Sequence, residues 1–278
     1  MNKMKILAAA IAFAAAGSAN AAIEMANTGN SSLVLAVWDD VAQESYIRDL
    51  GYNLADFTPA MVATDAGHSV NFAADPLFSS LFGDNDAANI YWNISAADST
   101  GTGATAGRQI IGTGALGAAA SGFSVSNTGV ANSSNYWNTF FNNANTQPSP
   151  DGSTCATSMS CYSVDPGDLQ YAGGSSTNVN MWGTNWGANL GGWYNAGTLG
   201  QSLGFYSFTT NAGLGFQQSD KARYENAYGI AAWTLAADGS LIYSLAGAPT
   251  AVPVPAAAWL LGSGLVGLVG VARRRAAK

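Results

Sequence analysis

The sequence predicts an all-β fold, an antiparallel, sandwich-like domain with one or two short helices. Short aromatic or β-branched runs alternate with Gly, Ser, Thr and Asn, and long charged helix-forming residues are scarce. Seven of the eight tryptophans lie before residue 250, together with many Tyr and Phe residues. Because disordered chains generally lack aromatic residues, this composition favours a folded domain over disorder.

The first expected hairpin lies near the start of the domain. Residues 32–38 are apolar at both alternating sets of positions, as in a strand that is buried on both faces. Asp39 and Asp40 follow as turn residues, and we expect residues 45–50 to return as the partner strand.

Two further strands are expected in the middle of the chain. Ile90, Trp92 and Ile94 alternate with more polar residues, which predicts a strand with one buried face. Residues 109–111 are a candidate partner for it across a Gly- and Thr-rich segment, and residues 203–209 predict another strand.

A second hairpin is expected near the end of the domain. Residues 229–235 and 241–245 are apolar runs on either side of Ala237-Asp238-Gly239-Ser240. Asp-Gly between two such runs predicts a tight turn, because both residues tolerate positive φ.

Two short helices are expected to cover the sheet. Asp75 and Pro76 provide an N-cap and a first-turn proline for a helix through residue 82. Residues 135–142 place three aromatic side chains at i, i+3 and i+4, which predicts the second helix. Residues 142–152 contain two prolines and are expected to form a long loop.

The N-terminus has the three-part layout of a secretory signal peptide. Lys3 and Lys5 precede an apolar stretch over residues 6–16, and Ala19-Asn20-Ala21 supplies small residues for cleavage after Ala21. We therefore expect residues 1–21 to be a signal peptide and residues 22–250 to be a secreted β-rich domain.

The C-terminus combines prolines, an apolar run and a basic cluster. Pro253, Val254 and Pro255 precede the uncharged residues 256–272, which as a helix would span roughly 25 Å, enough for a short transmembrane segment. Three arginines and Lys278 close the chain and favour a cytoplasmic C-terminus. The arginines are Arg273, Arg274 and Arg275. A simple single-span anchor is the alternative reading of this segment.

The order of these parts resembles the PEP-CTERM sorting signal of Gram-negative bacteria. Residues 252–264, VPVPAAAWLLGSG, are similar to the family's variant form, with Val254 where Glu is commonest. The resemblance covers residues 251–278 and implies recognition by an exosortase, removal of the tail, and release to the cell surface or an exopolysaccharide matrix. It implies nothing about the fold of the preceding domain.

The charge of the expected domain is strongly negative. All 17 acidic residues lie within residues 22–250, where only Arg48, Arg108, Lys221 and Arg223 are basic, so the formal charge there is 4 − 17 = −13. Such a surface repels phosphate backbones, which argues against nucleic acid as a partner and suits a secreted protein or one that takes up divalent cations.

Cys155 and Cys161 are the only cysteines. In an oxidising compartment their spacing is compatible with a disulfide that closes a small loop. Free thiols and metal ligands are the less favoured alternatives, because metal sites of this kind need more Cys or His residues.

Two motifs associated with catalysis lack their required context. Residues 112–117 match GxGxxG, but the next acidic residue is Asp151, far beyond the spacing of a dinucleotide site. Residues 200–204 match GxSxG around Ser202. In hydrolases with this motif the catalytic histidine follows the serine in the chain, but the only histidine here, His68, precedes it. We interpret Ser202 as a turn residue.

The acidic residues leave a calcium site and a hydrolase open. Asp84 with Asp86, and Asp165 with Asp168, are closely spaced oxygen donors of the kind that calcium prefers, although neither pair completes a calcium loop. A glycosidase would need two carboxylates roughly 5 to 10 Å apart, and the sequence does not select a pair.

Residues 181–195 contain three tryptophans among Gly and Asn, namely Trp182, Trp186 and Trp193. Aromatic rings beside amide side chains suit sugar recognition, but the favoured reading is that these rings form the domain's core. The resulting expectation is a non-catalytic cell-surface or exopolysaccharide-matrix protein sorted by an exosortase. A glycan-binding module and, less favoured, a secreted glycoside hydrolase are the alternatives.

Overall fold

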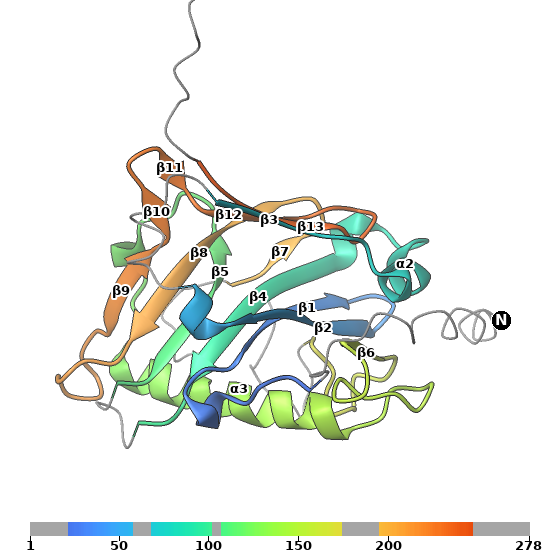
Figure 1. Ribbon diagram of the computed structural model, residues 1–278, viewed down its shortest axis with the longest axis horizontal. Coiled ribbons are helices and arrows are strands. Elements are labelled where there is room, and N and C mark those ends of the chain that lie inside the picture. Colours follow the sequence, from blue (N-terminus) through green and yellow to red (C-terminus); the bar gives the residue numbers. More distant parts are fainter. Residues whose placement is uncertain (1–21, 58–67, 102–106, 174–194, 247–278) are drawn as a thin grey trace, which may run out of the picture. The chain divides into compact units, whose positions relative to one another are not determined.

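The structure is a computed structural model that describes residues 22–57, 68–101, 107–173 and 195–246. In these ranges the chain is mostly β, and two α-helices accompany the strands (Figure 1). The helices are α2 (Pro76–Phe82) and α3 (Asn127–Thr146). The strands are β1 (Ser32–Asp39), β2 (Glu44–Asn53), β3 (His68–Phe72), β4 (Ile90–Asp98), β5 (Gln109–Ala115), β6 (Ser160–Ser163), β7 (Gly197–Thr198), β8 (Ser202–Thr209), β9 (Asp220–Arg223), β10 (Glu225–Asn226), β11 (Gly229–Ile230), β12 (Ala232–Leu235) and β13 (Leu241–Leu245).

The strands pair antiparallel throughout the described residues, as expected. Eleven of them form one curled sheet with the order β3-β13-β12-β8-β5-β4-β1-β2-β6, while β7 pairs with β4 and β9 with β8. The remaining two, β10 and β11, form a separate ribbon. The expected β1–β2 hairpin and the pairing of β4 with β5 are both confirmed.

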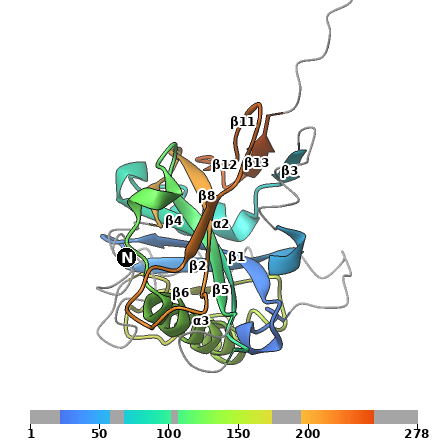
Figure 2. The ribbon, with the colours of Figure 1, turned by 90° about the vertical axis from the view of Figure 1, so that its left-hand side faces the viewer.

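Two hydrophobic clusters lie on opposite faces of this sheet. Alternate residues of β1 divide between them, with Leu33, Leu35 and Val37 in one and Val34 and Ala36 in the other. The first cluster also contains residues of β12 and β13, because the sheet curls until its two halves share one core. The second is covered by α3, which lies at the bottom of both views, whereas strands β3, β12 and β13 lie at the top (Figures 1 and 2).

The central strand β4 differs from its expected pattern. The sequence predicts one buried face, but Asn93 and Ser95 on the other face are also fully buried. They pair with Ala36 and Val34 of β1, whose side chains belong to the cluster under α3. The prediction was wrong because polar side chains such as Asn93 and Ser95 usually indicate a strand face exposed to solvent. In the structure α3 covers this face.

The expected C-terminal hairpin forms between β12 and β13, but its first strand is shorter than predicted. Residues 229–230 instead form β11, which pairs with β10. The pairing of β12 with β13 begins at Ala232, opposite Ser244. In the turn only Gly239 adopts positive φ, at +85°, and a Cβ there would lie 2.5 Å from the ring of Phe78. Glycine is therefore required both by the backbone conformation and by the close approach of α2.

The helix α2 begins and ends where the sequence predicts. The Asp75 carboxylate accepts a hydrogen bond from the backbone N–H of Leu77, and Pro76 occupies the first turn. Phe78, Leu81 and Phe82 are buried in the cluster on the face opposite α3. The confirmed N-cap thus starts a helix whose apolar side covers the sheet.

The second helix is much longer than the predicted short helix. α3 comprises 20 residues, Asn127–Thr146, and therefore includes the first part of the segment expected to be a loop. Ser126 caps it by accepting a hydrogen bond from the Gly129 N–H. Its length comes from packing against the sheet, since Val130 and Ala144, near opposite ends, are both fully buried.

Candidate functional site

Most residues on which the expected function depends lie outside the described residues. These residues belong to the expected signal peptide, the expected sorting tail and the tryptophan-rich segment. They comprise residues 1–21, Pro253, Val254, Pro255, residues 256–272, Arg273, Arg274, Arg275, Trp182, Trp186 and Trp193. None of the helices in the described ranges combines the length and hydropathy needed to cross a bilayer.

The GxGxxG pattern does not occupy a nucleotide-binding turn. Gly112 and Gly114 are paired within β5, with Tyr206 and Gly204 of β8 as their partners. The chain after β5 enters a turn at Gly117, where φ is +80°. A dinucleotide site needs these glycines between a strand and the start of a helix, so the pattern here is part of the sheet.

Ser202 and His68 are not brought together. The Ser202 Oγ lies 2.7 Å from the Oγ1 of Thr234, a hydroxyl–hydroxyl contact that supplies no general base. His68 starts β3 opposite Leu245, and β12 and β13 lie between β3 and β8 in the sheet. Ser202 was predicted to be a turn residue, but it is the first residue of β8 and pairs with Thr234 of β12.

Three of the four acidic residues singled out in the sequence accept hydrogen bonds from nearby residues of the same loop. Asp86 accepts a hydrogen bond from the Ala88 N–H at 3.0 Å. Asp165 accepts from the Gly167 N–H at 2.8 Å, and Asp168 accepts from the Ser163 Oγ at 2.6 Å. Among the described residues, no three His, Cys, Asp or Glu side chains gather closely enough to hold a metal ion.

Three further acidic residues, Asp39, Asp40 and Glu44, lie at the β1–β2 turn. Asp39 accepts hydrogen bonds from the backbone N–H groups of Val41 and Ala42, at 2.7 and 2.8 Å. Burial raises the pKa of Asp40 and of Glu44, and the neighbouring Asp39 carboxylate adds to both increases. The sequence signal that could have indicated this group is the pair of adjacent aspartates followed by a glutamate on the returning strand.

Tyr171 packs beside this acidic turn. Its side chain is 3% exposed. Burial raises the pKa of Tyr171, and the negative charges of the three carboxylates raise it further. Burial, which is the largest cause of the raised pKa of Tyr171, Asp40 and Glu44, therefore disfavours the charged form of each of these three groups.

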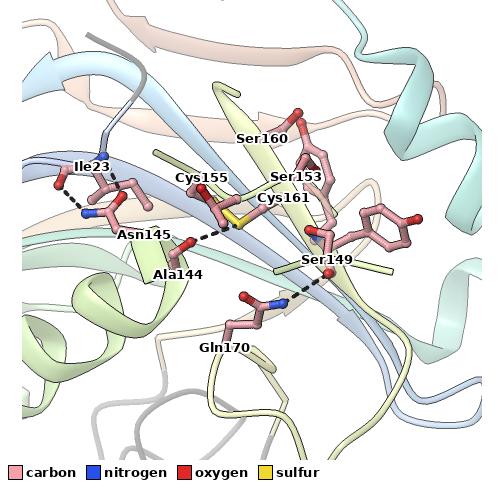
Figure 3. The surroundings of a disulfide bond; sticks show 12 residues. Ile23, Ala144, Asn145, Ser149, Ser153, Cys155, Ser160, Cys161 and Gln170 are labelled. Carbon is pink, nitrogen blue, oxygen red and sulfur yellow. Dashed lines mark hydrogen bonds between the residues drawn. A yellow bond between two sulfur atoms is a disulfide. The ribbon is translucent and has the colours of Figure 1, made fainter. Parts of the chain in front are cut away.

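The predicted disulfide forms between Cys155 and Cys161, whose Cα atoms are 4.9 Å apart (Figure 3). Both cysteines are fully buried in the cluster beneath α3. The Cys155 N–H donates a hydrogen bond to the carbonyl of Ala144 at 3.0 Å, which connects the bridged loop to the last turn of α3. The bridge thus fixes the loop that follows α3 to both the helix and the edge strand β6.

The start of the described chain is bound at the same place. The Asn145 side chain accepts from the Ile23 N–H at 2.9 Å and donates to the Ile23 carbonyl at 2.8 Å (Figure 3). Ile23 is 1% exposed and packs in the cluster beneath α3. The residue two positions after the predicted cleavage site is therefore an integral part of the domain.

The chain matches no protein-family model, and comparisons with curated proteins and with solved structures find no match.

Proposed function

We propose that this chain is an exported, non-catalytic cell-surface or exopolysaccharide-matrix protein that an exosortase sorts through its C-terminal tail. The observation that carries this proposal is the order of parts at the C-terminus. Pro253-Val254-Pro255 is followed by the apolar residues 256–272 and then by Arg273-Arg274-Arg275. In this account the apolar segment holds the chain in the inner membrane before processing.

The properties of the domain support export. The Cys155–Cys161 disulfide is fully buried, and such bridges form and persist in oxidising compartments. The formal charge of −13 over residues 22–250 (4 basic minus 17 acidic residues) favours a soluble surface that is repelled by nucleic acid.

The contacts of the candidate nucleophile Ser202 and of two candidate calcium ligands, Asp86 and Asp165, support a non-catalytic role. The Ser202 hydroxyl contacts another hydroxyl, and the carboxylates of Asp86 and Asp165 accept hydrogen bonds from nearby backbone N–H groups. These are structural uses of residue types that catalysis could have employed.

The proposal can be tested by replacing Pro253 and Pro255 with alanine and fractionating the producing cells. We expect the double variant to accumulate in the inner membrane, whereas the parent chain reaches the surface or the matrix. Pro150→Ala, at an exposed proline of the domain, is the matched control and should be sorted normally. Normal sorting of the double variant would contradict recognition of the tail by an exosortase and would favour an ordinary anchor.

Glycan binding is the second candidate function. It is favoured by the segment 181–195, in which Trp182, Trp186 and Trp193 alternate with Gly and Asn. Replacing the three tryptophans together by alanine would abolish polysaccharide binding if they form the sugar-binding surface. If they are core residues, the same substitutions would unfold the domain instead, which far-UV circular dichroism distinguishes.

A further inference from the structure

The loop between β8 and β9 exposes two large apolar side chains. Leu214 is 60% exposed and Phe216 is 76% exposed, the largest value among the large hydrophobic residues that the structure describes. Residues 211–219, NAGLGFQQS, contain no charged residue. The loop, orange in Figure 1, extends from the sheet beside the start of α3.

This loop is held in place by the first turn of α3. The fully buried side chain of Asn127 donates to the Oδ1 of Asn211 at 3.0 Å and to the Leu214 carbonyl at 3.1 Å. Its Oδ1 accepts from the Asn211 N–H at 3.1 Å. Asn127 therefore links the beginning and the middle of the loop to the helix.

The backbone on both sides of Phe216 is held in the same way. The N–H groups of Asn127 and Thr128 donate to the carbonyls of Gln217 and Gly215, each at 2.9 Å. Because the loop is ordered by these contacts before any partner arrives, binding through Phe216 carries little additional cost in conformational entropy.

Two amide groups follow the exposed ring and are oriented by the protein. The Oε1 of Gln217 accepts from the Leu214 N–H at 2.7 Å, and the Oε1 of Gln218 accepts from the Lys221 Nζ at 2.6 Å. Since each oxygen is engaged by a donor, the Nε2 end of each amide is left to donate outward. Both glutamines are exposed.

An aromatic face beside amide donors defines the chemistry of the partner. The apolar C–H face of a pyranose ring can stack on Phe216, and its hydroxyl oxygens can accept from the two Nε2 groups. The charge of −13 over residues 22–250 (4 basic minus 17 acidic residues) repels polyanions and therefore selects against acidic glycans. We propose that the loop 211–219 is a docking surface for a neutral polysaccharide, with Phe216 as the stacking platform and Gln217 and Gln218 as hydrogen-bond donors.

This inference rests on the proposed extracellular matrix location for its biological setting, but its test needs no sorting. The purified full-length chain, kept in solution with a mild detergent, is run by affinity electrophoresis through gels that contain a neutral β-glucan, a mannan or a galactan. A gel containing a polyuronate serves as the anionic comparison. Failure of sorting in cells and failure of binding in these gels are therefore separate results.

Three substitutions sharpen the test. Phe216→Ala should weaken binding to the retarding polysaccharide about tenfold, as when an aromatic anchor of an interface is truncated. Gln218→Glu keeps the oxygen that contacts Lys221 but removes the donor, so it should also weaken binding. Tyr228→Ala, at another exposed aromatic side chain, is the control and should bind like the parent.

Retardation of the parent by a neutral polysaccharide, together with its loss in Phe216→Ala, would support the proposal. The proposal is overturned if no neutral polysaccharide retards the parent, if only the polyuronate does, or if Phe216→Ala binds like the parent. Flotation with phosphatidylcholine vesicles that depends on Phe216, without binding to any polysaccharide, would also overturn it and assign the loop to a lipid surface.

Discussion

Replacing Asp75 with alanine tests how α2 is attached to the edge of the sheet. One carboxylate oxygen of Asp75 accepts from the Leu77 N–H at 2.9 Å and caps the helix. The other accepts from the Tyr46 hydroxyl of β2 and from the Ser160 hydroxyl of β6, each at 2.8 Å. One side chain thus joins a helix and two strands.

The expected cost follows from these contacts. Loss of an N-cap costs about 1 kcal/mol. The hydroxyl of Tyr46, a residue that is only 1% exposed, would also lose its acceptor, and an unsatisfied buried donor costs about 1–3 kcal/mol. We therefore expect Asp75→Ala to lower the free energy of unfolding by about 3 kcal/mol.

Urea denaturation followed by tryptophan fluorescence and by far-UV circular dichroism measures this difference. Asp86→Ala is the matched control, because Asp86 caps only a single exposed 3₁₀ turn and should cost less than about 1 kcal/mol. In a Tyr46→Phe background the cost of Asp75→Ala should decrease, since the buried hydroxyl of Tyr46 is then absent and only that of Ser160 loses its acceptor. An unchanged cost in that background, or one equal to that of Asp86→Ala, would refute the reasoning.

Three further predictions concern the disulfide, a buried carboxylate and the bound N-terminal segment. Replacing Cys155 and Cys161 together by alanine should destabilise the domain by about 2 kcal/mol, the value expected for so short a loop, and an unchanged urea midpoint would contradict this. Burial raises the pKa of Asp49 from its ordinary value of 3.8, so its ionisation penalises the folded state increasingly as the pH rises from about 3.8 through the raised value. Asp49→Asn should therefore gain stability relative to the parent over that pH range, and a difference independent of pH between 3 and 8 would refute the assignment. Asn145→Ala should speed hydrogen exchange at the Ile23 amide, which loses its acceptor, whereas exchange as slow as in the parent would show that Asn145 does not hold this segment.

Several strands of the sheet, β1 above all, could be predicted because their pattern is local. In β1 apolar residues occupy both alternating sets of positions, and the two hydrophobic clusters of the structure take one set each. The turn at Asp238-Gly239 could also be predicted, because the positive φ of Gly239 is required by the turn itself. Neither inference needed knowledge of distant residues.

The extent of α3 could not be read in the same way. Its first eight residues, NTGVANSS, are mostly weak helix formers that cost up to about 1 kcal/mol each relative to alanine. They are helical because Val130 and Ala131 pack against the sheet and Asn127 binds a loop 84 residues away in the sequence. Such contacts exist only after the sheet has formed, so periodicity within the segment does not reveal them.

The candidate sites also differ in whether a local sequence pattern predicts them or whether they depend on contacts between distant residues. The proposed sorting tail is predicted from a contiguous pattern around Pro253 and Arg273, and this prediction needs no knowledge of the fold. The β8–β9 loop was missed because Phe216 in a Gly- and Gln-rich stretch has the same local pattern whether it is buried or exposed. Only the structure shows that this ring is 76% exposed and that its neighbours are tied to α3.

The measurement that tests the central claim most directly is intact mass spectrometry of the native protein from membrane and extracellular matrix fractions, with and without the host's exosortase. We predict that the matrix form has lost the segment from about Pro253 onward, and that this loss occurs only when the enzyme is present. A full-length, membrane-bound chain in both strains would contradict sorting and make the tail a simple anchor.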